Sequence, residues 1–242
     1  DRLRDEDITW ADYVFLSAMA VQKDSVREVI RQVHGQGGKI VAGGPLFTME
    51  PENFRDVEHL VLGEAEGIIN EFVADLEAGA PKREYRAAAF PDMAETPVPD
   101  WSLIDLRHYS SMALQYSRGC PFNCEFCDIA LLNGRRPRTK SAAQFVAELE
   151  SLYAAGWREG VFIVDDNFIG NRDKLKTEVL PAIIKWRTER KVYMPFNTEV
   201  SINLADDDEL IRLMARAGFC AVFVGIETPN EESLQECTKN QN

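Results

Sequence analysis

Histidine, long apolar runs and positive charge are all scarce in this chain. Of its 242 residues only 3 are histidines, and all of them precede its one cluster of cysteines. No apolar run approaches the roughly 18 residues that a membrane-spanning helix needs, and no basic, apolar leader stands at the N-terminus. The formal net charge is −13. Because binding to a nucleic-acid backbone depends on Lys and Arg, this charge argues against nucleic acid as a partner.

Cysteine is also rare, and its distribution excludes a secreted disulfide framework. The chain has 5 cysteines, an odd number, and three of them fall between positions 120 and 127. Secreted frameworks usually have an even number of well-spaced cysteines, so we expect a reduced, cytoplasmic setting. Cys220 lies in an apolar run that resembles a strand, and Cys237 lies in a polar tail. Both are predicted to be ordinary thiols rather than ligands.

The clustered cysteines are Cys120, Cys124 and Cys127, with the spacing CxxxCxxC. This spacing places three thiolates within reach of one metal centre, yet no fourth ligand follows nearby. Structural zinc usually has four ligands, in pairs such as CxxC or HxxxH, and iron–sulfur cubes are usually held by four thiolates. Three cysteines without a partner therefore predict a 4Fe–4S cluster with one iron open to a molecule that is not protein. An incomplete zinc site and a chance cluster are the alternatives.

Before the cysteines, the chain alternates between predicted strands and helices. Strands are expected at 13–17, 39–42 and 59–62, with helices between Asp24 and Gly37 and around 68–76. Nearly continuous apolar strands predict a Rossmann-like parallel sheet covered on both faces. Such sheets bind ligands at the carboxyl ends of their strands, where this chain has Ser17, Gly43, Gly44, Gly63 and Glu64. Glycine lets a bulky ligand approach the backbone, although glycines at strand ends are common in any α/β domain.

A stretch rich in proline separates this region from the cysteines. Pro91, Pro97 and Pro99 interrupt a sequence without apolar periodicity. Proline lacks a backbone donor and disfavours helix, so the stretch is predicted to be a linker. The chain is therefore expected to have three parts: a first domain at 1–80, a linker at 81–112 and a second domain at 113–242.

After the cysteines, strands and helices alternate again. Strands are expected at 160–164, 195–200 and 220–227. The helices between them are expected to begin with a capping box at Ser141, to be kinked at Pro181, and to run from caps at Asp206 to Asp208 as far as Gly218. A repeat of roughly thirty residues is what βα units require.

Acidic and amide side chains mark the ends of these later strands. Asp165, Asp166 and Asn167 follow the first strand, Glu199 ends the second, and Glu227 ends the third. In α/β barrels, polar residues at the carboxyl ends of strands are the best site candidates. Asp165 and Asp166 are equally compatible with solvated loop positions. Glu199 and Glu227 lie in apolar strands, where burial without a partner is costly, and this favours a binding role.

Together these features resemble the cobalamin-dependent radical S-adenosylmethionine (SAM) enzymes. The shared order is a Gly-Gly-Pro segment at 43–45, a V-x-GEAE segment at 61–66, a proline-rich linker and then CxxxCxxC. The flanking run 116–119, the aromatic Phe126 and the later Asp-Asp-Asn-Phe-Ile-Gly-Asn run at 165–171 are similar to the branch that includes hopanoid methylases. The resemblance covers nearly the whole chain.

The resemblance implies a partial cobalamin-binding Rossmann-like sheet followed by a partial (β/α)6 radical SAM barrel. The three clustered cysteines would hold the 4Fe–4S cluster, its open iron would bind SAM, and Phe126 would pack near the SAM adenine. The implied SAM-binding residues are Asp165, Asp166, Asn167, Glu199 and Glu227, and the implied cobalamin-binding residues are Ser17, Gly43, Gly44, Gly63 and Glu64. The implied reaction is cleavage of SAM to a 5′-deoxyadenosyl radical, followed by methyl transfer from cobalamin to an unactivated carbon.

The resemblance also implies partners and leaves two alternatives open. The cluster would need an electron donor such as flavodoxin or ferredoxin, and the substrate would be a small molecule. In the hopanoid-like branch a lipid substrate would bring the enzyme to a membrane surface. The alternatives are a cyclase or rearrangement enzyme of the same family that transfers no methyl group, and a non-catalytic iron–sulfur or zinc-binding module.

The chain departs from the family pattern at both ends. Two further strand–helix units usually come first, and in some members they carry a D-x-H-x-x-G loop whose histidine ligates cobalt. This chain starts at Asp1, near the third unit, and neither His34 nor His59 lies in such a loop. Only about four strands of a six-strand barrel fit before Asn242. We therefore expect a chain truncated at both ends, without a readable lower ligand for cobalt.

Overall fold

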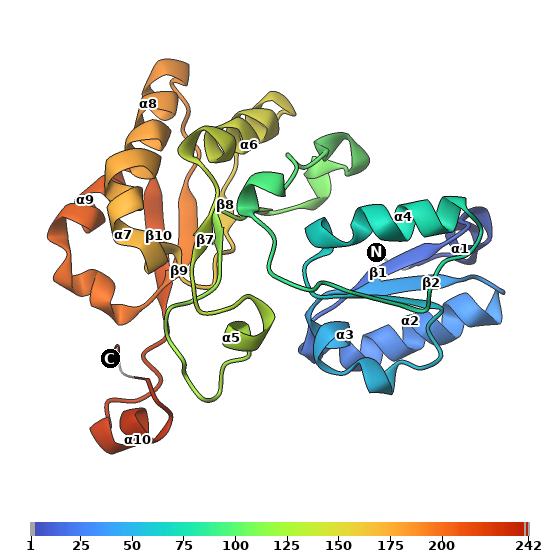
Figure 1. The fold of residues 1–242 in the computed structure, drawn as a ribbon. Helices are drawn as coiled ribbons and strands as arrows, with labels where there is room; N and C mark the ends of the chain where they lie inside the picture. The colour runs from blue at the N-terminus through green and yellow to red at the C-terminus, as the bar shows by residue number, and fades with distance from the viewer. Residues whose placement is uncertain (1–2, 240, 242) are drawn as a thin grey trace. The chain divides into compact units, whose positions relative to one another are not determined.

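The computed structural model describes residues 3–239 and 241, and the chain divides into two compact units. The first unit is Asp1–Pro91 and the second is Asp92–Asn242. Each contains a four-stranded parallel sheet with helices packed on it (Figure 1). The predicted α/β class with parallel sheets is therefore confirmed. The division between the units falls inside the stretch 81–112 that the prolines mark.

The first unit is built around four parallel strands in the order β1–β2–β3–β4. The strands are Val14–Ser17 (β1), Ile40–Gly43 (β2), His59–Leu62 (β3) and Glu84–Arg86 (β4). The helices are Asp5–Trp10 (α1), Lys23–Gly35 (α2), Pro45–Met49 (α3) and Ile69–Glu77 (α4). Helix α4 covers one face of the sheet, and α2 and α3 cover the other (Figure 1).

Alternation along β2 explains why both faces of this sheet are covered. Ile40 and Ala42 belong to the apolar cluster that includes Ile30 of α2, whereas Val41 belongs to the cluster that includes Phe72 of α4. Successive side chains of a strand point to opposite faces, so a strand buried on both sides has a continuous apolar sequence. Each fully buried side chain of this size stabilises the fold by about 1.5–3 kcal/mol. Burial on both faces therefore fixes the strand in its register.

The second unit has a parallel sheet in the order β10–β9–β8–β5 and a separate antiparallel ribbon. The strands of the sheet are Met112–Leu114 (β5), Val161–Ile163 (β8), Phe196–Val200 (β9) and Phe219–Val224 (β10), and the ribbon pairs Ser117–Arg118 (β6) with Arg138–Thr139 (β7). The helices are Ile129–Leu132 (α5), Ala142–Ala154 (α6), Arg172–Lys174 (α7), Leu180–Arg190 (α8), Asp208–Ala217 (α9) and Glu231–Glu236 (α10). Side chains of α6, α8 and α9 form one apolar core with the sheet.

Side chains cap the N-termini of α6 and α9 as predicted, but the capping box expected at α6 is not complete. The Ser141 hydroxyl accepts a hydrogen bond from the Gln144 N–H at 3.1 Å, and the Asp207 carboxylate caps α9. The predicted capping box at Ser141 is incomplete, because the Gln144 amide does not return to the cap. It donates to the backbone carbonyls of Met93 and Thr96 instead, at 2.9 and 3.1 Å. Gln144 therefore ties the segment before β5 to α6.

The bend predicted at Pro181 takes the form of a change in helix type. Leu175–Val179 form a π-helical segment between α7 and α8, and Pro181 lies in the first turn of α8. Proline has no N–H to donate and its fixed φ suits a first turn, so a new helix begins there. Nowhere in residues 3–239 is there a helix long and apolar enough to cross a bilayer.

Two strands lie where the sequence indicates only linker, and one predicted strand is shorter than expected. β4 pairs with β3, and β5 pairs with β8. Each has 3 residues, too few to show the alternation by which a strand is recognised. The prediction that 81–112 lacks regular structure was therefore wrong at β4, whereas β5 shares only Met112 with this stretch. β10 ends at Val224, so Glu227 lies beyond the strand rather than at its end.

Candidate active site

The three clustered cysteines lie on the segment between β6 and α5. Cys120 and Cys124 are half-buried, and Cys127 is exposed. The Cys120 N–H donates to the Gly134 carbonyl at 3.2 Å, and the Cys127 N–H donates to the Cys124 carbonyl at 3.1 Å. Because β6 pairs with β7, backbone hydrogen bonds close the base of the loop that carries the cysteines.

Gly119, directly before the first cysteine, has a conformation that requires glycine. Its φ is 95°, in a region that side chains avoid. A Cβ atom there would lie 2.9 Å from each of three carbonyl oxygens, those of Asn133, Gly134 and Arg136. The direction in which the chain enters Cys120 is therefore set by sterics within the protein.

Asp165, after β8, is a buried acceptor for the backbone of β6. Its Oδ1 atom accepts from the Tyr116 N–H at 2.7 Å, and its Oδ2 atom accepts from the Ser117 N–H at 2.8 Å and the Ser117 hydroxyl at 2.5 Å. Burial raises the pKa of this carboxyl to about 7, although these hydrogen bonds oppose the change. Only 1% of the residue is exposed. This placement points to a positioning role rather than to the predicted contact with SAM.

The next two residues extend the hydrogen bonding to both sides of β8. Asp166 Oδ2 accepts from the Gly119 N–H at 2.8 Å and from the Asn133 side-chain amide at 2.9 Å. The buried Asn167 donates from Nδ2 to Ser201 Oγ at 3.1 Å, and its Oδ1 accepts from the Ser201 N–H at 3.2 Å. The three polar residues after β8 thus join the cysteine segment on one side to the end of β9 on the other.

The thiols of the three clustered cysteines lie near one another and near Asp166. Burial raises the pKa of the Cys120 thiol, a hydrogen bond from the Phe122 backbone opposes this, and nearby Cys127, Asp166 and Cys124 raise it further. The three thiols are therefore close enough to interact electrostatically. Among residues 3–239 and 241, no group of three or more His, Cys, Asp or Glu side chains is placed to hold a metal ion. In an iron–sulfur cube each thiolate binds a different iron, so three thiols on one short loop provide the donors for three of its four irons.

Glu199 is not buried as the sequence argument required. It is an exposed position of β9. Partial desolvation of its carboxyl and the negative charge of Asp166 raise its pKa. The premise that this acid would be buried without a partner was therefore wrong, because one face of β9 is open at this position. Its predicted contact with SAM stays a prediction.

Glu227 is also partly exposed, and it is paired with a lysine. Its φ is 61°, and its side chain, 44% exposed, forms an ion pair with Lys239 at 2.9 Å. Lys239 is buried, and its Nζ atom lies 5.6 Å from the centre of the Phe126 ring, within the range of a cation–π contact. Phe126 itself remains 57% exposed. The structure thus brings two predicted site residues, Phe126 and Glu227, to the same lysine.

Residues near the C-terminus also contact the cysteine segment, and sequence reasoning missed them. The Glu125 N–H donates to the Cys237 carbonyl at 2.9 Å. Gln241 Nε2 donates to Cys124 Sγ at 3.3 Å across a sequence separation of 117. No periodic pattern marks pairs so far apart in the chain. A segment expected to be a polar tail is therefore part of the site.

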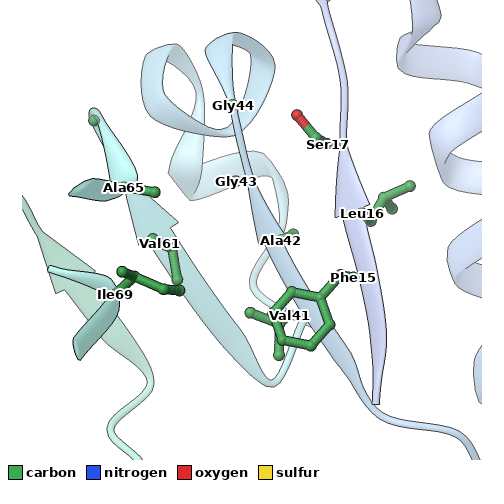
Figure 2. Close-up of a pocket in the computed structure, with 11 residues that line it drawn as sticks. Phe15, Leu16, Ser17, Val41, Ala42, Gly43, Gly44, Val61, Ala65 and Ile69 are labelled. Carbon is green, nitrogen blue, oxygen red and sulfur yellow. The ribbon is translucent and has the colours of Figure 1, made fainter. Parts of the chain in front are cut away.

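In the first unit a pocket lies at the carboxyl ends of β1, β2 and β3, with a volume of about 220 Å³ (Figure 2). Its lining includes Ser17, Gly43, Gly44 and Gly63 together with the apolar Phe15, Val41, Val61 and Ile69. Glu64 follows at the start of the short 3-10 turn Ala65–Gly67. Four of the five residues predicted to bind a cofactor in this unit therefore line one pocket.

Gly44→Ala is expected to destabilise the first unit at this pocket. Gly44 has a φ of +85°, and a Cβ atom there would lie 2.6 Å from Ser17 Oγ. A strained backbone position of this kind costs about 1–3 kcal/mol, measurable by urea denaturation. Gly67→Ala is the matched control, because nothing lies within 4 Å of its Cβ position. Equal stability of the two variants would contradict the steric argument.

The fold and the cysteine loop define a class of protein. Residues 114–242 match the Radical SAM superfamily, and the chain belongs to this family. The solved structure of TsrM from Kitasatospora setae, a radical S-adenosylmethionine methyltransferase with tryptophan and a SAM analogue bound, matches with a TM-score of 0.80 at 18% identity. The match covers 98% of this chain and 53% of TsrM. The predicted fold, a Rossmann-like sheet followed by a partial barrel, is thereby confirmed.

Two relatives are similar over nearly the whole chain. An uncharacterised methyltransferase of Synechocystis sp. is 46% identical over 96% of this chain. The hopanoid C-2 methylase of Rhodopseudomonas palustris is 35% identical over 98% of it. The chain spans 44% and 46% of these two proteins, which is about half the length of the curated relatives it matches.

Proposed function

We propose that this chain is the cofactor-binding part of a radical SAM enzyme that uses cobalamin to methylate an unactivated carbon. The proposal rests on the three cysteines, which have CxxxCxxC spacing and no fourth cysteine in the motif. They lie on a loop whose base is closed by backbone hydrogen bonds between β6 and β7. Similarity to a Synechocystis methyltransferase and to a hopanoid C-2 methylase supports methyl transfer as the reaction.

In this proposal the three cysteines hold a 4Fe–4S cluster and nearby side chains hold SAM. When bound, such a cluster supplies the electron that cleaves SAM to a 5′-deoxyadenosyl radical. Phe126 offers an exposed aromatic face to the adenine. Glu199 and Glu227 offer carboxylate oxygens to the ribose hydroxyls or the ammonium of SAM, and charge-assisted hydrogen bonds of this kind contribute roughly 1.5–3 kcal/mol. Asp165 and Asn167 keep the cysteine segment and the end of β9 in place.

The pocket of the first unit is the proposed site for cobalamin. Its glycines allow a ligand to approach the backbone of β2 and β3 closely, and its other walls are apolar. Ser17 and Glu64 provide polar groups at the same strand ends. A volume of about 220 Å³ accommodates one part of so large a cofactor. When bound, cobalamin supplies the methyl group. The structure of TsrM with cobalamin and a 4Fe–4S cluster bound supports this assignment.

The proposed partners are an electron donor and a small-molecule substrate. Cys127 is exposed, so a cluster held there is accessible to a donor of the flavodoxin or ferredoxin type. Similarity to the hopanoid C-2 methylase supports a lipid as the substrate.

Electron paramagnetic resonance of the anaerobically reconstituted and reduced protein tests the proposal. We expect a 4Fe–4S signal that changes when SAM is added, because the open iron gains a ligand. A signal indifferent to SAM, or zinc in place of iron, contradicts the assignment. In the full-length protein, SAM labelled in its methyl group is expected to label the product. An unlabelled product would identify a cyclase or rearrangement enzyme instead.

A further inference from the structure

Asp166 is a charged group in direct contact with the turn into the first cysteine. Its Oδ2 atom accepts from the Gly119 N–H at 2.8 Å, and Gly119 directly precedes Cys120. The same oxygen accepts from the Asn133 amide at 2.9 Å. Gly119 has a φ of 95°, and an added Cβ atom there would meet three carbonyl oxygens, so this turn requires glycine. The carboxylate is therefore fixed beside the cysteine loop.

The hydrogen-bond donors that contact Asp166 Oδ2 are neutral groups. They are the Gly119 N–H and the Asn133 side-chain amide, and Asp166 itself is half-buried. Its field reaches other groups, because it contributes to the raised pKa of both Asp165 and Glu199. Charges in a partly desolvated site are screened less than charges in water. Asp166 is thus a fixed source of negative potential at this site.

Negative potential beside a redox centre opposes the addition of an electron. The reduction potential of an iron–sulfur cluster depends on net charge, on hydrogen bonds to its sulfurs and on exposure to solvent. Reduction transfers one electron from an external reductant to the cluster, which makes the cluster more negative by one charge. A carboxylate next to that cluster destabilises its reduced form and lowers the potential.

We propose that Asp166 sets the reduction potential of the cluster by holding a negative charge beside Cys120. The inference rests on the proposed 4Fe–4S cluster at the three cysteines. A lower potential makes the reduced cluster a stronger electron donor to the sulfonium of SAM. Asp166 therefore acts through the cluster rather than on the substrate, and its two hydrogen bonds keep its charge at a constant distance from the cysteine loop.

The substitution Asp166→Asn tests the effect of the charge apart from the effect of the two hydrogen bonds that Asp166 accepts. Asparagine keeps one carbonyl oxygen that can accept the two hydrogen bonds made to Asp166 Oδ2, while the other carboxylate oxygen becomes an NH2 group and the negative charge is lost. Asp206→Asn is the matched control, because Asp206 is an exposed acid in the turn Ile202–Asp206 and its replacement changes the net charge by the same amount. Both variants and the wild type are reconstituted anaerobically and titrated with dithionite, with the reduced signal followed by electron paramagnetic resonance.

We expect Asp166→Asn to bind as much iron as the wild type and to have a more positive midpoint potential, both before and after SAM is added. Asp206→Asn is expected to keep the wild-type potential. An unchanged potential in a fully loaded Asp166→Asn cluster overturns the proposal. A shift that appears only with SAM also overturns it, since Asp166 would then act on SAM.

If Asp166→Asn binds no iron, the variant Asp166→Glu, which keeps the negative charge, is measured in its place. A loaded Asp166→Glu cluster at the wild-type potential supports the need for charge at this position. Loss of iron from both variants reduces Asp166 to a structural role and overturns the proposal. A wild-type protein that takes up no 4Fe–4S cluster contradicts the proposed function itself, whereas a loaded wild type with unshifted variants contradicts only the role of Asp166.

Discussion

Cys124→Ala is expected to abolish the formation of 5′-deoxyadenosine from SAM. With two thiolates left, a second iron of the cluster loses its protein ligand. Cys124 is half-buried in the middle of the motif, so water reaches the vacated position less freely than at Cys127. Iron content and 5′-deoxyadenosine are measured on the same anaerobic sample, and both are expected to fall to background.

The matched controls are Cys220→Ala and Cys237→Ala. Cys220 lies in β10 with its Sγ atom directed to the Phe196 carbonyl at 3.4 Å, and Cys237 contacts the cysteine segment through its backbone carbonyl. Neither replacement removes a cluster ligand, so both variants are expected to keep iron and to cleave SAM. Formation of 5′-deoxyadenosine by Cys124→Ala at the rate of these controls would contradict the assignment of the motif.

Asp165→Ala is expected to lower the free energy of unfolding of the second unit by about 3–9 kcal/mol. The substitution leaves three donors around β6 without their acceptor, and each unsatisfied buried donor costs about 1–3 kcal/mol. Since domains are stable by only about 5–15 kcal/mol, much of this unit is expected to unfold in mild denaturant. Trp157 and Trp186 are buried in its core, so tryptophan fluorescence in urea reports the transition.

Asp206→Ala is the control for this loss, because Asp206 is exposed and the cap of α9 is its neighbour Asp207; a surface substitution of this kind changes stability by at most about 0.5 kcal/mol. Comparable stability of Asp165→Ala and Asp206→Ala would mean that the buried carboxylate does not hold β6.

The pKa of Asp165 adds a pH dependence with a definite sign. It is raised from 3.8 to about 7 by burial, so the folded protein binds the proton more tightly than the unfolded chain. The stability that Asp165 contributes is therefore fully present below pH 3.8 and declines as the pH rises towards 7. The difference in unfolding free energy between the wild type and Asp165→Ala is expected to shrink over this interval.

The elements and the cluster motif could be read from the sequence because they depend on local patterns. The apolar runs of β2 and β3 report burial on both faces of a sheet, and CxxxCxxC places three thiols on one loop whatever surrounds it. The glycines at 43, 44 and 63 were found for a similar reason, since each follows directly on an apolar strand.

The roles of the polar residues could not be read in the same way. Asp165 has the sequence context of a loop acid, and only the folded structure shows that it accepts hydrogen bonds from the backbone of Tyr116 and Ser117. Glu227 was misplaced because apolar residues continue past the point where β10 ends at Val224. Lys239 has no local pattern at all, because its partners Glu227 and Phe126 are set by tertiary packing.

The pairing of β6 with β7 has a consequence for the life of the protein in air. Small zinc domains are unfolded without their metal, because the metal supplies the free energy of folding. Here backbone bonds and the two aspartates after β8 close the cysteine loop. We therefore expect a protein that has lost its cluster to oxygen to keep the fold of this loop, so that a new cluster can be inserted without refolding of the chain once the thiols are reduced.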